Sequence, residues 1–189
     1  MFVDGGCIAA ITGSSGSGKT TLLNCLALLE RPTSGRIMYG DEVEATKLRH
    51  HARLKYRRHH LGYLLQTPAL VENDTVSKNL QLVRTTRRGY LKSEEEALER
   101  VGLAGIEKEK IYYLSGGEQQ RVALAQILIK KPSVVLLDEP TSALDDTNTH
   151  MVIDVMNELS AGGASIIVAT HSNQIRACAD IEYEIPPNS

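Results

Sequence analysis

Aromatic residues and long apolar segments are both scarce in this chain. Its 189 residues include no tryptophan and one phenylalanine, against seven tyrosines. The apolar runs at 134–137 and 166–169 are far shorter than the roughly 20 residues that a helix needs to cross a bilayer. The N-terminus has no basic segment followed by an apolar stretch, so no secretory signal is visible. We therefore expect a cytoplasmic protein that contacts a membrane only through another protein.

Cysteine content and net charge are low as well. Cys7, Cys25 and Cys178 lie in apolar segments, which favours reduced core thiols over disulfides or a metal site. A formal net charge of -2 gives no general reason to expect a nucleic-acid partner. A chain of this length can bury one core but is short for two, so we predict a single domain over 1–189.

Three short apolar runs predict the strands of a buried parallel sheet. They occupy 8–12, 134–137 and 166–169, and they are continuous rather than alternating, as in strands that helices cover on both faces. Leucines at helical spacing follow the first run, and apolar residues at helical spacing fill 151–159 between the other two. This order of strands and helices predicts an α/β fold.

The segment 67–114 has a different character. It lacks β-branched runs, and its clearest element, 93–101, opens with a serine and three glutamates, which favour a helix N-terminus. We predict an inserted, mainly helical subdomain at 67–114. The remaining parts, 1–66 and 115–189, would form the catalytic core.

A glycine-rich loop follows the first predicted strand and matches the phosphate-loop pattern G-x-x-x-x-G-K-[ST] without a mismatch. Glycines let the backbone aim its N–H groups at phosphate oxygens, and the following helix adds its positive N-terminal end. Lys19 would reach the β- and γ-phosphates, and the Thr20 hydroxyl would ligate Mg²⁺. The alternative is a flexible linker, which is not normally placed between a buried strand and a leucine-rich helix. The predicted nucleotide contacts here are Gly13, Ser14, Ser15, Gly16, Ser17, Gly18, Lys19, Thr20 and Thr21.

Two carboxylates end the predicted strand at 134–137. Ligands bind at the carboxyl ends of the strands in a parallel sheet. Asp138 is therefore placed to hold Mg²⁺, and Glu139 is placed to act as the general base for the water that attacks the γ-phosphate. An acidic loop without a function is the alternative for this pair alone, and the phosphate loop argues against it.

The segment 114–118 (LSGGE) precedes an apolar helical pattern at 119–130. Ser115 and Glu118 match an S-x-x-E capping box, so the plain interpretation is a well-capped helix. The same five residues, however, resemble the signature motif of ABC (ATP-binding cassette) ATPases, and the resemblance extends over nearly the whole chain. It implies a P-loop NTPase fold of the RecA-like kind, with a mainly parallel sheet flanked by helices.

The ABC resemblance also implies ligands and roles for single residues. Gln66 resembles the glutamine that contacts Mg²⁺ and the attacking water, and the segment 142–145 resembles the loop that crosses the dimer interface. His171 resembles the switch histidine that contacts the γ-phosphate of ATP. The implied catalytic residues are Glu139, His171 and Gln66, and the implied metal ligands are Thr20, Gln66 and Asp138. The signature residues that would close over the ATP of a second ABC subunit, head to tail, are Ser115, Gly116 and Gly117.

The function that the resemblance implies is ATP hydrolysis that drives transport, by a subunit attached to a transmembrane permease on the inner face of the membrane. The Gln66 region is most similar to the lipoprotein-release and macrolide or peptide export branch. The alternative is an ABC ATPase that acts on nucleic acid or ribosomes. Such proteins carry a long coiled coil or a second cassette, whereas only residues 67–113 separate Gln66 from Leu114 here. A small-molecule kinase would leave 114–118 unexplained.

Other parts of the chain depart from the family pattern. Members usually carry two more strands and an adenine-stacking aromatic residue before the phosphate loop, and we match neither Phe2 nor Tyr39 to that residue. We expect an incomplete N-terminal antiparallel part, an unpaired strand at 37–39, and weak nucleotide binding with poor selectivity for the base. A fragment, a mis-called start or a degenerate copy would behave in this way. Gln126 stands where an arginine is common, and Asn79 lacks the glutamate that often precedes it.

A basic segment at 47–60 stands outside these motifs. It contains six lysines and arginines and four histidines. The histidines come as adjacent pairs without a nearby cysteine, which does not suit a metal site. We expect a solvated basic surface rather than a metal or nucleic-acid site.

Overall fold

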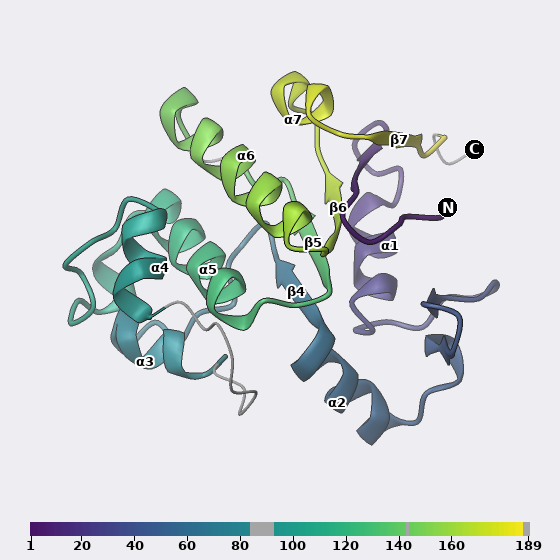
Figure 1. Cartoon of the computed structure of the whole chain (residues 1–189), viewed down its shortest axis with the longest axis horizontal. Coiled ribbons are helices and arrows are strands. Elements are labelled where there is room, and N and C mark those ends of the chain that lie inside the picture. Colours follow the sequence, from purple (N-terminus) through teal and green to yellow (C-terminus); the bar gives the residue numbers. More distant parts are fainter. Residues whose placement is uncertain (84–92, 143, 187–189) are drawn as a thin grey trace.

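The computed structural model describes residues 1–83, 93–142 and 144–186. Figure 1 shows a central group of strands with helices on either side. In chain order the elements are β1 (Ile8–Thr12), α1 (Lys19–Leu26), β2 (Met38–Tyr39), β3 (Val43–Glu44), the 3₁₀ turn η1 (Ala45–Lys47), α2 (His50–His60), β4 (Leu61–Leu64), α3 (Val76–Gln81), α4 (Glu94–Arg100), the 3₁₀ turn η2 (Ile111–Tyr113), α5 (Gly116–Lys130), β5 (Val134–Asp138), α6 (Asp146–Ala161), β6 (Ser165–Ala169), α7 (Asn173–Ala177) and β7 (Ile181–Glu184).

The main sheet is parallel, as the sequence predicts. Within the described residues its strand order is β4-β5-β6-β1-β7, and each neighbouring pair runs in the same direction. All five side chains of β1 and of β5 are buried, because helices cover both faces of the sheet and leave no solvent-facing side. The phosphate loop follows β1 and Asp138 ends β5, so both lie at the carboxyl edge of the sheet, with β6 between the two strands.

Helices α1, α5 and α6 bury the two faces of the sheet. Alternate residues of each strand point to opposite faces, so Leu136 and Ile167 pack in a cluster with α1, whereas Val135 and Val168 pack with α5 and α6. Figure 1 shows α1 on one side of the strands and α5 and α6 on the other. The sheet therefore fixes the start of α1 beside the ends of β5 and β6.

The described part of the segment between β4 and α5 contains α3, α4 and η2, joined by turns and irregular chain, and α3 and α4 pack against α5. Helix α4 starts one residue later and ends one residue earlier than the predicted 93–101, and its N-cap, Ser93, forms a capping box with Glu96. Asn79 and Gln126, the two positions that depart from the family pattern, contact each other here. The Gln126 side chain donates a hydrogen bond to the Asn79 carbonyl at 2.8 Å. Residues 84–92 lie outside the described part, and the division into core and subdomain stays a prediction.

The strand expected to be unpaired has a partner. Met38 and Tyr39 pair antiparallel with Glu44 and Val43, so the expectation that the strand at 37–39 is unpaired was wrong, although its other edge has no strand partner among the described residues. The physical reason is local: Gly40 takes a φ of 60° in the connecting turn, which lets the chain return on itself at once. The Tyr39 hydroxyl also donates to the carbonyl of Leu26, which ties the hairpin to α1.

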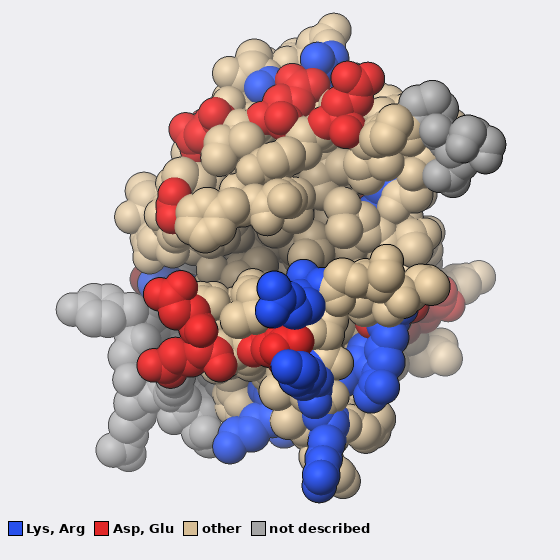
Figure 2. Space-filling model, turned by 90° about the vertical axis from the view of Figure 1, so that its right-hand side faces the viewer, with Lys and Arg blue, Asp and Glu red and all other residues tan. Residues whose placement is uncertain are grey.

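Helix α2 carries the basic segment, and none of its residues is buried. Figure 2 shows lysines and arginines gathered over the lower part of one face, at the height at which α2 and the β2–β3 hairpin lie in Figure 1. Across the described residues, no helix combines the length and the apolar character that spanning a membrane requires.

Candidate functional site

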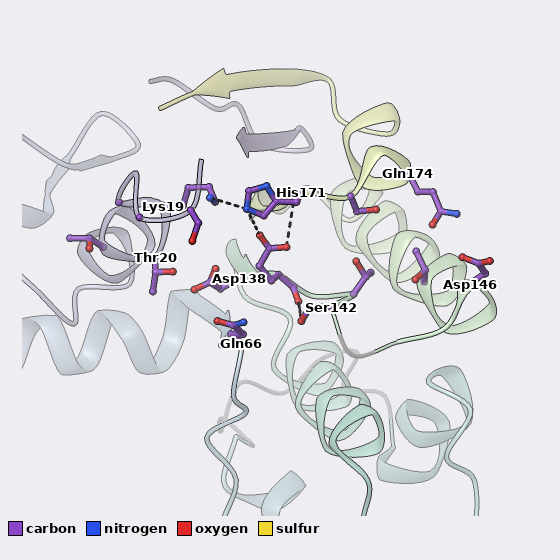
Figure 3. Close-up of a pocket in the computed structure, with 16 residues that line it drawn as sticks. Lys19, Thr20, Gln66, Asp138, Ser142, Asp146, His171 and Gln174 are labelled. Atoms are coloured by element: carbon purple, nitrogen blue, oxygen red, sulfur yellow. Dashed lines mark hydrogen bonds and ion pairs between the residues drawn. The ribbon is translucent and has the colours of Figure 1, made fainter. Parts of the chain in front are cut away.

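A cavity of about 810 Å³ opens at the carboxyl edge of the sheet. The phosphate loop and the start of α1 form one wall, Gln66 after β4 and the end of β5 form the floor, and the starts of α6 and α7 form the opposite wall. Figure 3 shows Lys19, Thr20, Gln66, Asp138 and His171 around this cavity. Residues from distant parts of the sequence therefore meet at one place, as expected at the carboxyl end of parallel strands.

The phosphate loop leaves the N-terminus of α1 without a side-chain cap. Its N-cap residue, Gly18, has a φ of 99° and makes no side-chain hydrogen bond, and the first turn of the helix holds no acidic residue. Gly16 also has a positive φ, 79°, and a side chain at either glycine would be strained there. The first N–H groups of α1 are therefore open to an anion, which the positive end of the helix dipole favours.

Lys19 lies under this loop with its ammonium group facing the cavity. The residue is 8% exposed, and its Nζ donates to the carbonyls of Gly13 at 2.9 Å and Ser14 at 3.1 Å. The same Nζ lies 3.2 Å from Nε2 of His171. These partners are two carbonyl oxygens and a histidine ring, and none is a carboxylate. A nearby anion would therefore compensate the buried positive charge of Lys19.

The loop also contains a buried hydroxyl that no described group satisfies. Ser17 is 5% exposed, and its Oγ has no hydrogen-bond partner. Gly13 packs so closely that a Cβ there would lie 2.8 Å from this Oγ and 2.7 Å from the carbonyl oxygen of Ile185. Ser17 does not line the cavity, whereas the uncapped helix end and Lys19 do, and these two features fit the phosphate chain of a nucleotide.

Asp138 and Glu139 end β5 in different environments. Asp138 is 3% exposed, and its carboxylate forms no hydrogen bond or ion pair with any described residue. Burial, and then the charges of Asp138 and Glu30, raise the pKa of the neighbouring Tyr63. A buried carboxylate without a partner that borders a cavity is a candidate for cation binding.

Glu139 is held in an uncommon backbone conformation. Its φ is 48°, in the left-handed region that non-glycine residues rarely adopt. Its Oε2 accepts a hydrogen bond from the backbone N–H of His171 at 3.3 Å, and its Oε1 lies 3.6 Å from His171 Nε2. Its carbonyl oxygen accepts bonds from Ser142 Oγ at 3.0 Å and from Gln120 Nε2 at 3.3 Å. These contacts hold Glu139 at the lining of the cavity, where His171 Nε2 lies close to both its carboxylate and Lys19 Nζ.

The oxygen atoms of Thr20, Gln66 and Asp138 face the same cavity. Hydroxyl, amide and carboxylate oxygens are hard ligands that suit Mg²⁺, which usually keeps water and substrate phosphate in its remaining positions. Among the described residues there is no cluster of three or more histidine, cysteine, aspartate or glutamate side chains that could hold a metal alone. The donor set therefore fits a Mg²⁺ ion that arrives with a phosphate ligand.

The signature residues lie elsewhere. Ser115 caps α5, and Gly116 and Gly117 form its first turn, outside the cavity of the same chain. The capping box is present: Glu118 accepts from the Ser115 N–H at 2.8 Å and from its hydroxyl at 2.7 Å. These bonds, first from the Ser115 hydroxyl and then from its backbone N–H, lower the pKa of Glu118. Ser115 therefore does not share the cavity of the phosphate loop within its own chain.

Some residues at the cavity carried no signal in the sequence. Asp146 and Thr149 lie on the first turn of α6, and Ser172 and Gln174 lie at the start of α7. The strands and loops that precede these residues were predicted, but the residue types at the four positions did not indicate that they would line a ligand site. Gln120, which does not line the cavity, also carried no signal: it is 3% exposed and joins α5 to the Glu139 carbonyl. Ala143, within the predicted loop 142–145, lies outside the described residues.

A comparison with known families decides the relationship. A sequence profile of the ABC transporter family matches residues 1–142. The chain belongs to the ABC transporter family. The predicted resemblance, and with it the P-loop fold of the ATP-binding cassettes, is therefore confirmed.

Curated relatives of this ABC chain include the branch that the sequence indicates. The lipoprotein-releasing system ATP-binding protein LolD of Aquifex aeolicus is 38% identical over 181 residues, which cover 93% of this chain and 80% of the relative. The macrolide export ATP-binding/permease protein MacB of Burkholderia thailandensis is 36% identical over 189 residues, 98% of this chain and 29% of the relative. Uncharacterised ABC transporter ATP-binding proteins of Mycobacterium tuberculosis are 37% identical over the whole chain, which spans 58% of their length.

Solved cassettes share the fold. A dimeric ATP-binding cassette in a post-hydrolysis state, bound to ADP and Pi, superposes with a TM-score of 0.87 at 29% sequence identity. The match covers 100% of this ABC chain and 86% of the solved one. The similarity includes the strands and helices that surround the cavity described above.

Proposed function

We propose that this ABC chain binds ATP with Mg²⁺ and hydrolyses it as the nucleotide-binding subunit of a transporter. One observation carries the proposal: Lys19, Asp138, Glu139 and His171 converge on a single cavity beside an uncapped helix N-terminus. A phosphate chain would find backbone N–H groups, an ammonium and a cation-binding carboxylate there. A fold neighbour that binds ADP and Pi supports the same reading.

Each residue has a role in this proposal. Lys19 would exchange part of its contacts with the loop carbonyls for the β- and γ-phosphates. Thr20, Gln66 and Asp138 would hold Mg²⁺, which screens the charge of the phosphate oxygens when it is bound. Glu139, fixed by the His171 N–H, would accept a proton from the attacking water. The His171 ring, between Lys19 and Glu139, would then contact the γ-phosphate.

The signature residues would act on a second subunit. Ser115 and the N–H groups of the first turn of α5 lie outside the cavity of their own chain, so they would complete the γ-phosphate site of a partner cassette, head to tail. The relative whose solved structure is dimeric supports this arrangement. Closure would then depend on the γ-phosphate, and its loss on hydrolysis would release the pair.

A second cavity, of about 330 Å³, is a candidate surface for the permease. Leu29 and Leu54 are 42% and 44% exposed at its edge, and three cations, Arg57, Arg58 and Lys130, surround it. No described carboxylate forms an ion pair with either arginine. An amphipathic cytoplasmic segment of a permease with an acidic residue would suit both the apolar and the charged groups. The subunit would then lie at the inner face of the membrane, in an export or release system like those that its relatives' names describe.

The decisive experiment replaces the proposed base. We expect Glu139→Gln to retain ATP binding, to slow hydrolysis by ~10²-fold or more, and to accumulate as a dimer with ATP and Mg²⁺. Steady-state phosphate release and analytical ultracentrifugation measure the two effects. Glu109→Gln, at an exposed position, is the matched control and should behave like the parent. A Glu139→Gln protein that hydrolyses ATP at the parent rate would rule out this role.

A further inference from the structure

Two exposed tyrosines lie directly before the signature helix. Tyr112 and Tyr113 are 67% and 72% exposed, while Ile111, in the same 3₁₀ turn, is fully buried. The two rings meet edge to face, with centroids 5.6 Å apart and planes at 76°. Neither hydroxyl bonds to another described residue. So much exposed aromatic surface on a short turn indicates a binding role rather than packing.

The turn that carries these tyrosines is fixed to its surroundings. The N–H groups of Ile111 and Tyr112 donate to the carbonyls of Asp74 and Glu72 at 3.1 and 3.0 Å. From the other side, Gln119 on α5 donates to the carbonyl of Leu114 at 3.1 Å. The rings are therefore held at a set position beside the N-terminus of α5, so little conformational entropy of the backbone is lost when they bind a ligand.

The nucleotide cavity supplies groups for phosphates but no ring for a base. Among the described residues that line it there is no tyrosine, phenylalanine or tryptophan. Tyr39 is engaged under α1, where its ring stacks on that of Tyr56 with centroids 5.0 Å apart. Tyr63 donates its hydroxyl to Asn24 at 3.0 Å. A purine bound with its phosphates on the loop would therefore keep an uncovered face within the described part of one chain.

We propose that Tyr112 and Tyr113 of one subunit stack on the base of the nucleotide whose phosphates the partner subunit's loop holds. This inference rests on the proposed function, because α5 must first close over the partner's nucleotide. Tyr113 precedes Ser115 by two residues, about 7 Å of chain, and its ring extends further. With Ser115 at the γ-phosphate, this reach lets the tyrosine rings contact the remainder of the same nucleotide.

The physical basis is stacking between π systems. One base stacked on an aromatic side chain strengthens binding roughly 5- to 150-fold, with little preference among bases. The gain appears only in the closed dimer, because the tyrosines belong to the other chain. Affinity of the monomer for ATP is unchanged by their loss, and inorganic tripolyphosphate, which has no base, is insensitive to them in both states.

The test uses the full chain in the Glu139→Gln background, in which hydrolysis is expected to be slow. Removal of both rings, by Tyr112→Ala with Tyr113→Ala, raises the ATP concentration for half-maximal dimerisation tenfold or more in analytical ultracentrifugation. The paired Tyr→Phe changes retain the rings and behave like the parent. Leu82→Ala removes an apolar side chain that is 65% exposed and serves as the control. Circular dichroism confirms that each variant is folded.

A second measurement needs no variant. The chain has no tryptophan, so its ultraviolet fluorescence comes from tyrosine, and stacking on adenine quenches part of it when ATP closes the dimer. Tripolyphosphate leaves the emission unchanged. A parent that never dimerises with ATP overturns both this inference and the sandwich in the proposed function. A parent that dimerises, while the double Ala variant needs the same ATP concentration, overturns the tyrosine contact alone.

Discussion

Two helix N-termini in this molecule are built in opposite ways. Helix α1 begins after Gly18 with no side-chain cap and no acidic residue in its first turn. Helix α5 begins after Ser115 with a complete capping box, in which Glu118 accepts from the N–H and hydroxyl of Ser115. The first end is open to an anion from outside the chain, whereas the second already has a carboxylate of its own.

The difference shows what each end requires from a ligand. An uncapped helix end leaves N–H groups without partners, so α1 gains most from a phosphate held permanently in its own chain. The capped end of α5 is stable by itself, because a capping serine contributes about 0.5–2 kcal/mol. For Ser115 to bind a phosphate, its hydroxyl must leave Glu118. This exchange suits a contact that forms and breaks in every cycle.

The largest expected effect is a loss of ATP affinity at the uncapped N-terminus of α1. Lys19→Ala removes the ammonium beside the α1 N-terminus, and loss of one partner from a desolvated charge contact costs about 2–5 kcal/mol, or roughly 30- to 5,000-fold in ATP affinity. Equilibrium binding of a fluorescent ATP analogue measures it. Lys108→Ala, at an exposed position in the turn between α4 and η2, is the control. Equal affinities of the two variants would mean that the phosphates bind elsewhere.

The uncapped N-terminus of α1 was predictable from sequence because the residues that form it are consecutive in the chain. Eight consecutive residues supply the loop glycines, Lys19 and Thr20, and the buried runs beside them predict the strands that flank it. The bounds of β1 agree with the predicted run, and β5 and β6 extend theirs by one residue. A short continuous apolar run is typical of a strand that is buried on both faces, because such a strand has no solvent-facing side that would require polar residues.

Other features depend on contacts between distant segments, and the sequence alone did not reveal them. The bond from Gln120 to the Glu139 carbonyl joins residues whose side chains carry no motif of their own. The positive φ of Glu139 follows from how the chain leaves β5 beneath His171, not from the residue type. A strand at 37–39 was expected, but its pairing with β3 was missed because β3 is two residues long, too short for an alternating pattern.

The capped N-terminus of α5 can be tested against a second helix, α4, that has the same kind of cap. Ser93 caps α4 with the same capping box that Ser115 gives to α5. Ser115→Arg and Ser93→Arg should therefore lose similar stability, but only Ser115→Arg should block ATP-dependent dimerisation, because a bulky cation occupies the partner's γ-phosphate site. ATP binding by the monomer should be nearly intact in both. Gel filtration in the Glu139→Gln background tests this, and equal dimerisation by both variants would contradict a role of Ser115 in the partner's site.

The smallest expected effect is a pH dependence of stability at the C-terminus of α5. Lys130 is its last residue, where a helix C-terminus favours a cation, yet burial, and then Arg57 and Arg58, lower the pKa of Lys130 from 10.5 to about 8. Below about pH 8 the amine is protonated in both states, and burying its charge opposes folding by a constant amount. Between about pH 8 and 10.5 the unfolded chain binds more protons than the folded one, so this contribution to stability rises with pH.

Lys130→Gln removes that titration and keeps a donor for the Arg57 carbonyl, which Lys130 Nζ contacts at 3.0 Å. Urea unfolding at several pH values should show the parent gaining stability relative to Lys130→Gln from pH 8 upward. Taking the difference between the two proteins cancels the tyrosines, which also titrate in alkali. Lys108→Gln, at an exposed site, should show no such trend. A difference between parent and Lys130→Gln that stays constant from pH 7 to 10 would mean that the Lys130 ammonium is as well solvated in the fold as in the unfolded chain.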